Sequence, residues 1–337
     1  LDMAWDFNAI ENSEAGLNKH LSDWLEREFG KKQVKKLLEI KNEYYRLAYI
    51  RKPEHMGNTR TEEKDPIHNI LKDMYWTEEE VQTRLQEYIA LENRVHVISK
   101  KIPAQKRDSW FQLVEYPVKG AAEMNKKHLF AQLARHGKAD WNKSDDAHRA
   151  IAELTKTYNS LSGGKWNLMM EAQPRKLPVF GLMPRIDATS PMQPNETPLF
   201  LFNGADYTNF EGEKPIGHGL GYARKAVNIA KNSSINYEFT TSNLDSVWIE
   251  VALAPNHPVE GNSIRYGISM DGEAIKAVEY KTVGRSEEWK NNVLTNQAIR
   301  ITGHKLSKNG KHTLKISALD EGVTVDQIKI WHNKPDK

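Results

Sequence analysis

The hydrophobic positions of this chain change their spacing near residue 165, and the change divides the chain into two parts. In the first part apolar residues recur every three or four positions, as on the buried face of an amphipathic helix. Such stripes cover residues 17–29, 34–48, 81–98 and 147–161. Because the links between them are short, the pattern predicts an antiparallel helical bundle over residues 11–165.

Local signals place individual helix ends in this part. Thr77 followed three residues later by Glu80 is a capping box, which predicts that a long helix begins there. Residues 109–136 are expected to form two helical stretches, because Pro117 and Gly120 interrupt the pattern. In total we expect five or six helices.

In the second part apolar and polar residues alternate, which is typical of half-buried strands. Residues 247–253 show the alternation most clearly, and residues 264–270 repeat it up to an Asp-Gly turn that predicts a hairpin. A similar pair of strands is expected from residues 312–319 and 323–331, around Asp320-Glu321-Gly322. Short strands with turns at these intervals predict an antiparallel β-sandwich.

The fold class is therefore a multidomain chain, with an antiparallel helical bundle followed by an antiparallel β-sandwich. The sandwich is expected over residues 199–337, after an extended, proline-rich connector over residues 166–198 that packs along the bundle. Composition agrees with this division, because 15 of the 20 glycines and 10 of the 14 prolines follow residue 160.

Composition and charge exclude several classes of protein. The 48 basic and 45 acidic side chains leave a net charge of +3, so neither nucleic acid nor a membrane surface is an expected partner. No apolar run approaches the roughly 18 residues of a transmembrane helix. The absence of cysteine excludes disulfides, a thiolate nucleophile and cysteine-ligated zinc.

The sequence contains no assembled catalytic motif. Gly164-Lys165 does not form a phosphate-binding loop, because Asn159 and Trp166 stand where that motif needs Gly and Ser or Thr. Residues 217–221 lack the third glycine of a dinucleotide fingerprint. Neither Gly-x-Ser-x-Gly nor His-Glu-x-x-His occurs. We therefore assign no catalytic residue, no metal ligand and no cofactor.

Two groups of residues are candidates for ligand binding. Arg51 and His55 lie in a loop of mixed charge that could present polar groups to a ligand, although an ion pair that fixes the loop is the simpler role. In the sandwich, aromatic rings could stack on sugars, and the alternative for each is packing in the core or an interface. These aromatic residues are Trp248, Tyr280, Trp289 and Trp331.

Six short segments carry a resemblance that extends over nearly the whole chain. In the helical part these are YIRKPEHMG (49–57), WFQLVEYPVK (110–119) and QPRKLPVF (173–180). In the sandwich they are SEEWKNNVL (286–294), GKHTLKI (310–316) and DEGV (320–323). In this order and spacing they resemble the region after the barrel and the C-terminal domain of glycoside hydrolase family 115. Glu321 departs from the proline that the family often has, while Gly322 retains the tight turn.

The resemblance implies an α-glucuronidase, which removes glucuronic acid or its 4-O-methyl ether from xylan side chains. Family members have an N-terminal domain, a TIM barrel, a helical bundle and a C-terminal sandwich, so residues 1–10 are expected to be the tail of a missing barrel. The catalytic carboxylates belong to that barrel. We therefore expect a fragment that is inactive alone, from a secreted or periplasmic enzyme that acts as a homodimer on glucuronoxylan-type polysaccharide.

The resemblance also suggests how the fragment could touch a substrate. A tyrosine from the family's sandwich is thought to reach an active site, and Tyr280 is the candidate by position, with a strand tyrosine that covers the sandwich edge as the alternative. Arg51 and His55 are second candidates, because arginine can bind a glucuronate carboxylate in a bidentate manner. Two other functions stay open: an autonomous carbohydrate-binding module that uses Trp248 or Trp331, and a purely structural assembly unit.

Overall fold

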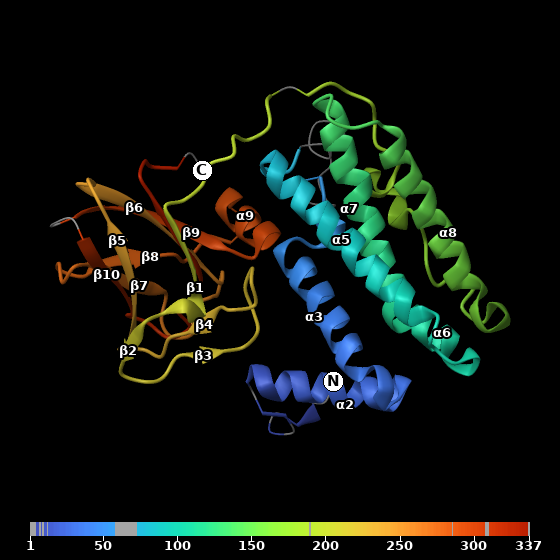
Figure 1. Ribbon diagram of the computed structural model, residues 1–337, viewed down its shortest axis with the longest axis horizontal. Helices are drawn as coiled ribbons and strands as arrows, with labels where there is room; N and C mark the ends of the chain where they lie inside the picture. Colours follow the sequence, from blue (N-terminus) through green and yellow to red (C-terminus); the bar gives the residue numbers. More distant parts are fainter. Residues whose placement is uncertain are drawn as a thin grey trace. The chain divides into compact units, whose positions relative to one another are not determined.

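The computed structural model describes residues 5, 6, 8, 10, 11, 13–57, 73–188, 190–284, 286–306 and 310–335. Most of residues 1–10, the expected tail of a barrel, lies outside this range. The chain divides into two compact units, which are described separately (Figure 1). One unit comprises Leu21–Asn195, and the other comprises Leu1–His20 together with Glu196–Lys337.

The first unit is helical, as the periodicity predicted. Among the described residues its helices are α2 (Glu14–Phe29, from Leu21 onward), α3 (Val34–Ile50), α5 (Glu78–Ser99), α6 (Arg107–Trp110), α7 (Tyr116–Arg135) and α8 (Asn142–Gly164). Helices α5, α7 and α8 lie side by side (Figure 1). A core cluster of the unit includes Leu37 of α3, Tyr88 and Leu91 of α5 and Trp110 of α6, each at most 1% exposed. The helical bundle is therefore confirmed.

The predicted capping box at the start of α5 is confirmed. The backbone N–H of Glu80 donates to Oγ1 of Thr77 at 3.1 Å, and the backbone N–H of Thr77 donates to Oε2 of Glu80 at 2.9 Å. The two side chains thus satisfy backbone groups that a helix start leaves without partners.

The predicted interruption near Pro117 and Gly120 is wrong. Helix α7 runs without a break from Tyr116 to Arg135, and the irregularity lies before it, in a π-helical turn over Phe111–Glu115. Pro117 occupies the first turn of α7, where its missing N–H costs little. Gly120 lies inside the helix, at a cost of about 1 kcal/mol relative to alanine that packing against neighbouring helices offsets.

The chain after α8 is tied to α7 by buried polar groups. The Lys127 ammonium donates to the carbonyl oxygens of Val179 at 2.8 Å and Gly181 at 3.1 Å. The ring of His128 is also bonded to the Val179 oxygen, at 3.1 Å. Short 3₁₀ turns at Pro174–Lys176 and Pro178–Phe180 occur in this segment, so it is not extended throughout.

The second unit is a sandwich of two antiparallel sheets, which confirms the predicted fold class. One sheet has the order β3-β4-β11-β6-β9, with β1 also paired to β11, and the other has the order β2-β5-β10-β7-β8. The first sheet consists of β1 (Phe200–Asn203), β3 (Ile216–Gly217), β4 (Val227–Asn228), β6 (Ser246–Leu253), β9 (Ala298–Lys305) and β11 (Thr324–Trp331). The second consists of β2 (Asn209–Glu211), β5 (Ser234–Thr241), β7 (Arg265–Met270), β8 (Lys276–Glu279) and β10 (Gly310–Ala318). Helix α9 (Glu287–Thr295) precedes β9.

The core of the sandwich lies between the sheets. Val247, Ile249, Val251 and Leu253 of β6 are fully buried there, as their alternation predicted. The other face of β6 is less exposed than its polarity suggests, because Glu250 is only 2% exposed. The β7–β8 hairpin is confirmed by its antiparallel pairing.

The second predicted hairpin is wrong. Strands β10 and β11 follow each other in sequence but belong to different sheets. The turn at Asp320-Glu321-Gly322 therefore crosses from one sheet to the other. A hairpin and a crossover between sheets give the same alternation of apolar and polar residues, because in both cases one face of each strand is directed at the core. The pattern therefore could not distinguish them.

Candidate functional site

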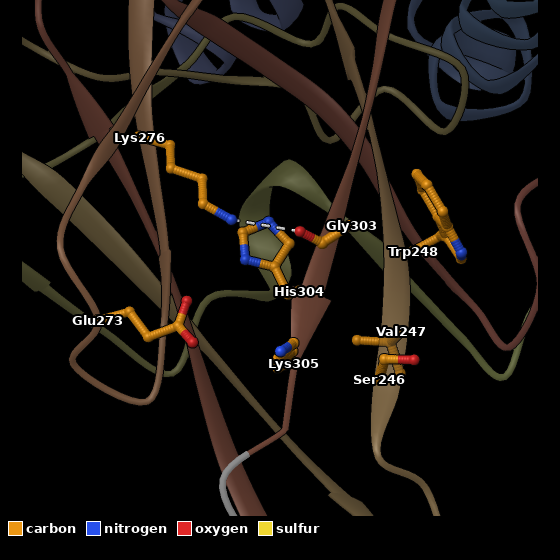
Figure 2. A pocket seen from close by; sticks show the side chains of 8 residues that line it. All are labelled: Ser246, Val247, Trp248, Glu273, Lys276, Gly303, His304 and Lys305. Atoms are coloured by element: carbon orange, nitrogen blue, oxygen red, sulfur yellow. Dashed lines mark hydrogen bonds between the residues drawn. The ribbon is translucent and has the colours of Figure 1, made fainter.

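A pocket of about 390 Å³ lies at one edge of the sandwich. It is formed by β6 and β9 of one sheet and by the β7–β8 hairpin of the other (Figure 2). Strands β9 and β8 are edge strands of their sheets, and the Arg300 side chain bridges them by donating to the Glu279 carbonyl oxygen at 2.8 Å. The lining residues are Ser246, Val247, Trp248, Glu273, Lys276, Gly303, His304 and Lys305.

His304 forms the buried wall of this pocket. It lies opposite Val247 in the antiparallel register, which directs both side chains to the core, and it is 2% exposed. Its Nε2 is bonded to Oγ1 of Thr302 at 2.9 Å, while its Nδ1 has no hydrogen-bond partner among the described residues. Burial lowers the pKa of His304, the nearby Lys276 lowers it further and Glu273 opposes the shift, so the ring is uncharged at neutral pH.

Trp248 lies on the opposite face of β6, beside Gly303 of β9. The two are register partners, and a Cβ atom built on Gly303 lies 3.4 Å from two atoms of the indole. The glycine thus leaves room for the ring to lie across β9. The Lys334 ammonium lies 5.5 Å from the ring centroid, a cation–π distance. Trp248 is half-buried, so part of the indole stays accessible at the pocket.

The charged groups of the pocket make few contacts with one another. Lys276 donates to the Gly303 carbonyl oxygen at 3.3 Å (Figure 2). Within the described ranges, Glu273 and Lys305 are exposed and make neither an ion pair nor a side-chain hydrogen bond. The lining therefore offers two ammonium groups and one carboxylate to a polar ligand. A glycosidase requires two positioned carboxyl groups, and this pocket has one.

The structure places Arg51 in the interior, and a binding role for Arg51 or His55 stays a prediction. Its guanidinium is 2% exposed, and its Nε and Nη2 donate to the backbone oxygen of His55 at 2.9 and 2.6 Å. Burial lowers the pKa of Arg51 to about 10, and the neighbouring Arg84 contributes. The side chain thus fixes the turn Pro53–His55 through a carbonyl group. Burial also lowers the pKa of the His55 ring.

Among the other sandwich candidates, Tyr280 and Trp331 are buried and Trp289 is half-buried. Tyr280 is 1% exposed, packs against Tyr266 and directs its hydroxyl to the Gly322 oxygen at 3.5 Å; burial raises its pKa. Trp331 is 8% exposed and donates from its indole to Glu250. Trp289 is half-buried in the first turn of α9. Only Trp248 of this group lines the pocket, and a binding role for any of them stays a prediction.

No pattern in the sequence indicates the pocket residues Glu273, Lys276, Gly303, His304 and Lys305. They come from two strands and a turn that meet only through the register of β6 with β9 and the stacking of the two sheets. Among the described residues, no group of three or more His, Asp or Glu side chains is placed to hold a metal ion. The helices within the described ranges include none with the length and apolar composition of a membrane span.

Comparison with known proteins identifies the class as carbohydrate-active. The family model described as "Glycosyl hydrolase family 115 C-terminal domain" matches residues 220–334, and the one described as "Glycosyl hydrolase family 115" matches residues 1–55. A solved family 115 4-O-methyl-α-glucuronidase, titled as specific for decorated arabinogalactans, is 45% identical over 99% of this chain, with a TM-score of 0.94. This chain belongs to glycoside hydrolase family 115. It spans 43% of the length of that relative.

Other solved structures match a smaller part of the chain. A mannanase from Podospora anserina with a family 35 binding module is 12% identical over 41% of this chain and 28% of its own, with a TM-score of 0.31. A family 35 carbohydrate-binding module from Clostridium thermocellum is 15% identical over 40% of this chain and 98% of its own, also with a TM-score of 0.31. Scores this low carry no argument about function. No curated protein sequence matched.

Proposed function

We propose that this chain is the C-terminal, non-catalytic part of an α-glucuronidase that removes glucuronic acid or its 4-O-methyl ether from polysaccharide side chains. The observation that carries the proposal is the 45% identity over 99% of the chain to a family 115 4-O-methyl-α-glucuronidase. The chain spans 43% of the length of that relative. Under this proposal, the catalytic residues come from the part of the parent enzyme that the chain does not include.

The chain itself is inactive under this proposal. The pocket at the sandwich edge contributes one carboxylate, Glu273, whereas glycoside hydrolysis uses a pair at a defined separation. In the parent enzyme, the helical unit and the sandwich serve structural, dimerisation or substrate-access roles. We place the enzyme outside the cytoplasm, secreted or periplasmic, because its polysaccharide substrate is too large to enter a cell intact.

The substrate stays open between two polymers with pendant glucuronate. The family resemblance favours glucuronoxylan, while the solved relative is described as specific for decorated arabinogalactans. An assay of released glucuronic acid from both polymers distinguishes them. We expect no release by the chain alone and release by the same chain joined to an upstream family 115 barrel.

Two controls make this assay decisive. The barrel segment alone reports whether the C-terminal part is needed, and sedimentation of the joined protein reports whether it is a dimer. Glucuronate release by the isolated chain refutes the inactive-fragment proposal.

A second function, a carbohydrate-binding module that works without a barrel, is favoured by one observation. Trp248, half-buried, lines a pocket together with charged side chains that have unused hydrogen-bonding capacity. Binding of a sugar by the isolated chain separates this function from a purely structural one.

A further inference from the structure

The pocket at the sandwich edge contains polar groups that the protein itself does not satisfy. Nδ1 of His304 is buried in its wall and has no hydrogen-bond partner within the described part of the chain. Most buried polar atoms in proteins have a partner, because leaving one without a partner destabilises the folded state. Other charged side chains of the sandwich form ion pairs, among them Arg265 with Asp320 at 2.9 Å and Lys315 with Glu211 at 2.7 Å. The buried Nδ1 of His304, beside the side chains of Glu273 and Lys305 that are unpaired among the described residues, is therefore available to a ligand in the pocket.

The size of the pocket restricts what it can hold. Its volume of about 390 Å³ is near the lower end of the range of small-molecule sites, about 300–1,000 Å³. A ligand the size of a single sugar suits this space, whereas a peptide segment or a protein surface does not.

The chemistry of the lining restricts the ligand further. Lys276 and Lys305 outnumber Glu273, and Lys334 adds a third ammonium over the indole of Trp248, so a negatively charged ligand is favoured. The accessible edge of the half-buried indole offers an apolar contact to a sugar ring. Glu273 accepts hydrogen bonds from hydroxyl groups, which a sugar has and a simple inorganic anion lacks.

We propose that this pocket binds a sugar that carries a carboxylate, a uronate, with Lys276 and Lys305 holding the carboxylate, Glu273 accepting from ring hydroxyls and Trp248 contacting the ring. The site lies in the sandwich, at the edge formed by β9 and the β7–β8 hairpin. The choice of uronate among acidic sugars rests on the proposed α-glucuronidase function, because polymers with pendant glucuronate present this ligand repeatedly.

Calorimetric titration of the full 337-residue chain tests the proposal with D-glucuronate as probe. D-Glucose serves as the neutral analogue, acetate as a carboxylate without a sugar ring, and sulfate as a simple anion. We expect saturable binding of glucuronate that is at least tenfold tighter than that of each comparison compound. Ionic strength is held constant, because charged contacts of exposed lysines are screened by salt.

Variants assign the binding to this pocket. Lys305→Met and Trp248→Leu are each expected to weaken glucuronate binding at least fivefold, and both positions are accessible enough for the chain to fold. Lys231→Met is the matched control, since Lys231 is also in the sandwich but pairs with Glu260 and does not line the pocket. Its affinity is expected to equal that of the unchanged chain.

Four outcomes overturn the proposal: no saturable binding, equal affinity for glucuronate and glucose, sulfate binding as tight as glucuronate binding, or unchanged affinity in Lys305→Met. None of them touches the α-glucuronidase proposal, which is tested by glucuronate release from a chain joined to a barrel. The two can therefore fail independently.

Discussion

The indole Nε1 of Trp331 donates a 3.0 Å hydrogen bond to Oε2 of Glu250, and both side chains are almost completely buried. The two residues lie on neighbouring strands of one sheet, β11 and β6. A tryptophan that is a candidate sugar platform in the sequence is thus also the hydrogen-bond partner of a buried carboxylate, and this contact stabilises the sheet. Its binding role stays a prediction.

This hydrogen bond predicts that replacement by phenylalanine lowers the free energy of unfolding more at Trp331 than at Trp248. Trp331→Phe removes a hydrogen bond from the buried Glu250 carboxylate, so we expect the free energy of unfolding to fall by about 1–3 kcal/mol. Trp248→Phe is the matched control, because Trp248 is half-buried and lies on the adjacent strand. Urea denaturation measures both, and an equal loss in the two variants contradicts the structural role of Trp331.

Two buried lysines of the helical unit predict how stability depends on pH. Lys127 and Lys41 are 0% and 7% exposed, and both donate to backbone carbonyl oxygens. Burial lowers the pKa of Lys127 to about 7 and that of Lys41 to about 8. Between pH 7 and 9 the unfolded chain keeps these protons while the folded chain releases them, so the folded state becomes more stable as pH rises.

We expect this increase to be on the order of 2–4 kcal/mol between pH 7 and pH 9. Lys127→Met should remove the larger part of it, even if the variant is less stable at every pH because the Val179 and Gly181 carbonyl groups lose their donor. Lys100→Met, at an exposed position after α5, is the control. Urea titrations at pH 7, 8 and 9 measure the dependence, and an unchanged slope in Lys127→Met counts against it.

Gly221 is predicted to resist substitution for two reasons at once. Its φ is +91°, and a Cβ atom placed there lies 2.2 Å from Oδ1 of Asp326. That carboxylate accepts hydrogen bonds from the Tyr222 backbone and the Gln297 side chain, so it cannot move away without loss. We expect Gly221→Ala to destabilise the sandwich by about 2–4 kcal/mol.

Gly261→Ala provides the comparison for that change. Its φ is +63°, but nothing lies within 4 Å of the added carbon, so the variant reports backbone strain alone, about 1 kcal/mol. Thermal unfolding of the two variants side by side separates the clash from the strain. Similar melting temperatures are incompatible with the proposed clash at Asp326.

The buried ring of His312 contacts a polar side chain at each of its two nitrogens, and the effect of losing one contact on stability can be measured. Its Nδ1 lies 2.7 Å from Oδ2 of Asp271, and its Nε2 lies 2.9 Å from Oγ1 of Thr241. Asp271→Ala leaves a fully buried ring nitrogen without that partner, and we expect a loss of about 1–3 kcal/mol in the free energy of unfolding. Asp245→Ala, in an exposed turn, is expected to change it by less than about 0.5 kcal/mol. Chemical denaturation that ranks these variants in the reverse order speaks against the contact.

Much of the fold could be predicted because local patterns decide it. The stripe over residues 81–98 and the capping box at Thr77 specify α5 within the chain itself. Pairing between strands is less local, since β10 has the same alternation whether it pairs with β11 or crosses to the other sheet. Pro117 led to a wrong prediction of a helix end for a related reason. The free-energy cost of a proline in a helix depends on the backbone before it, which here is a π-helical turn.

The candidate site was harder to predict than the fold. Trp248 could be selected by residue type, but its neighbours Gly303 and Lys276 are remote in sequence and meet it through register and sheet stacking. Residue type also selected Arg51 and Tyr280, whose polar groups bond to backbone carbonyl oxygens in the interior. Their binding roles stay predictions. Sequence alone does not show whether the rest of the fold covers a side chain, so it cannot distinguish a residue that faces a ligand from one that is buried in the interior.

Strand β11 is the last strand that the structure describes, yet it lies in the middle of its sheet, with β6 on one side and β1 and β4 on the other. A chain that is truncated before Thr324 has two unjoined half-sheets with open edges, which are targets for chaperones and proteases. Truncations on either side of β11 should therefore differ sharply in how much folded sandwich a cell retains.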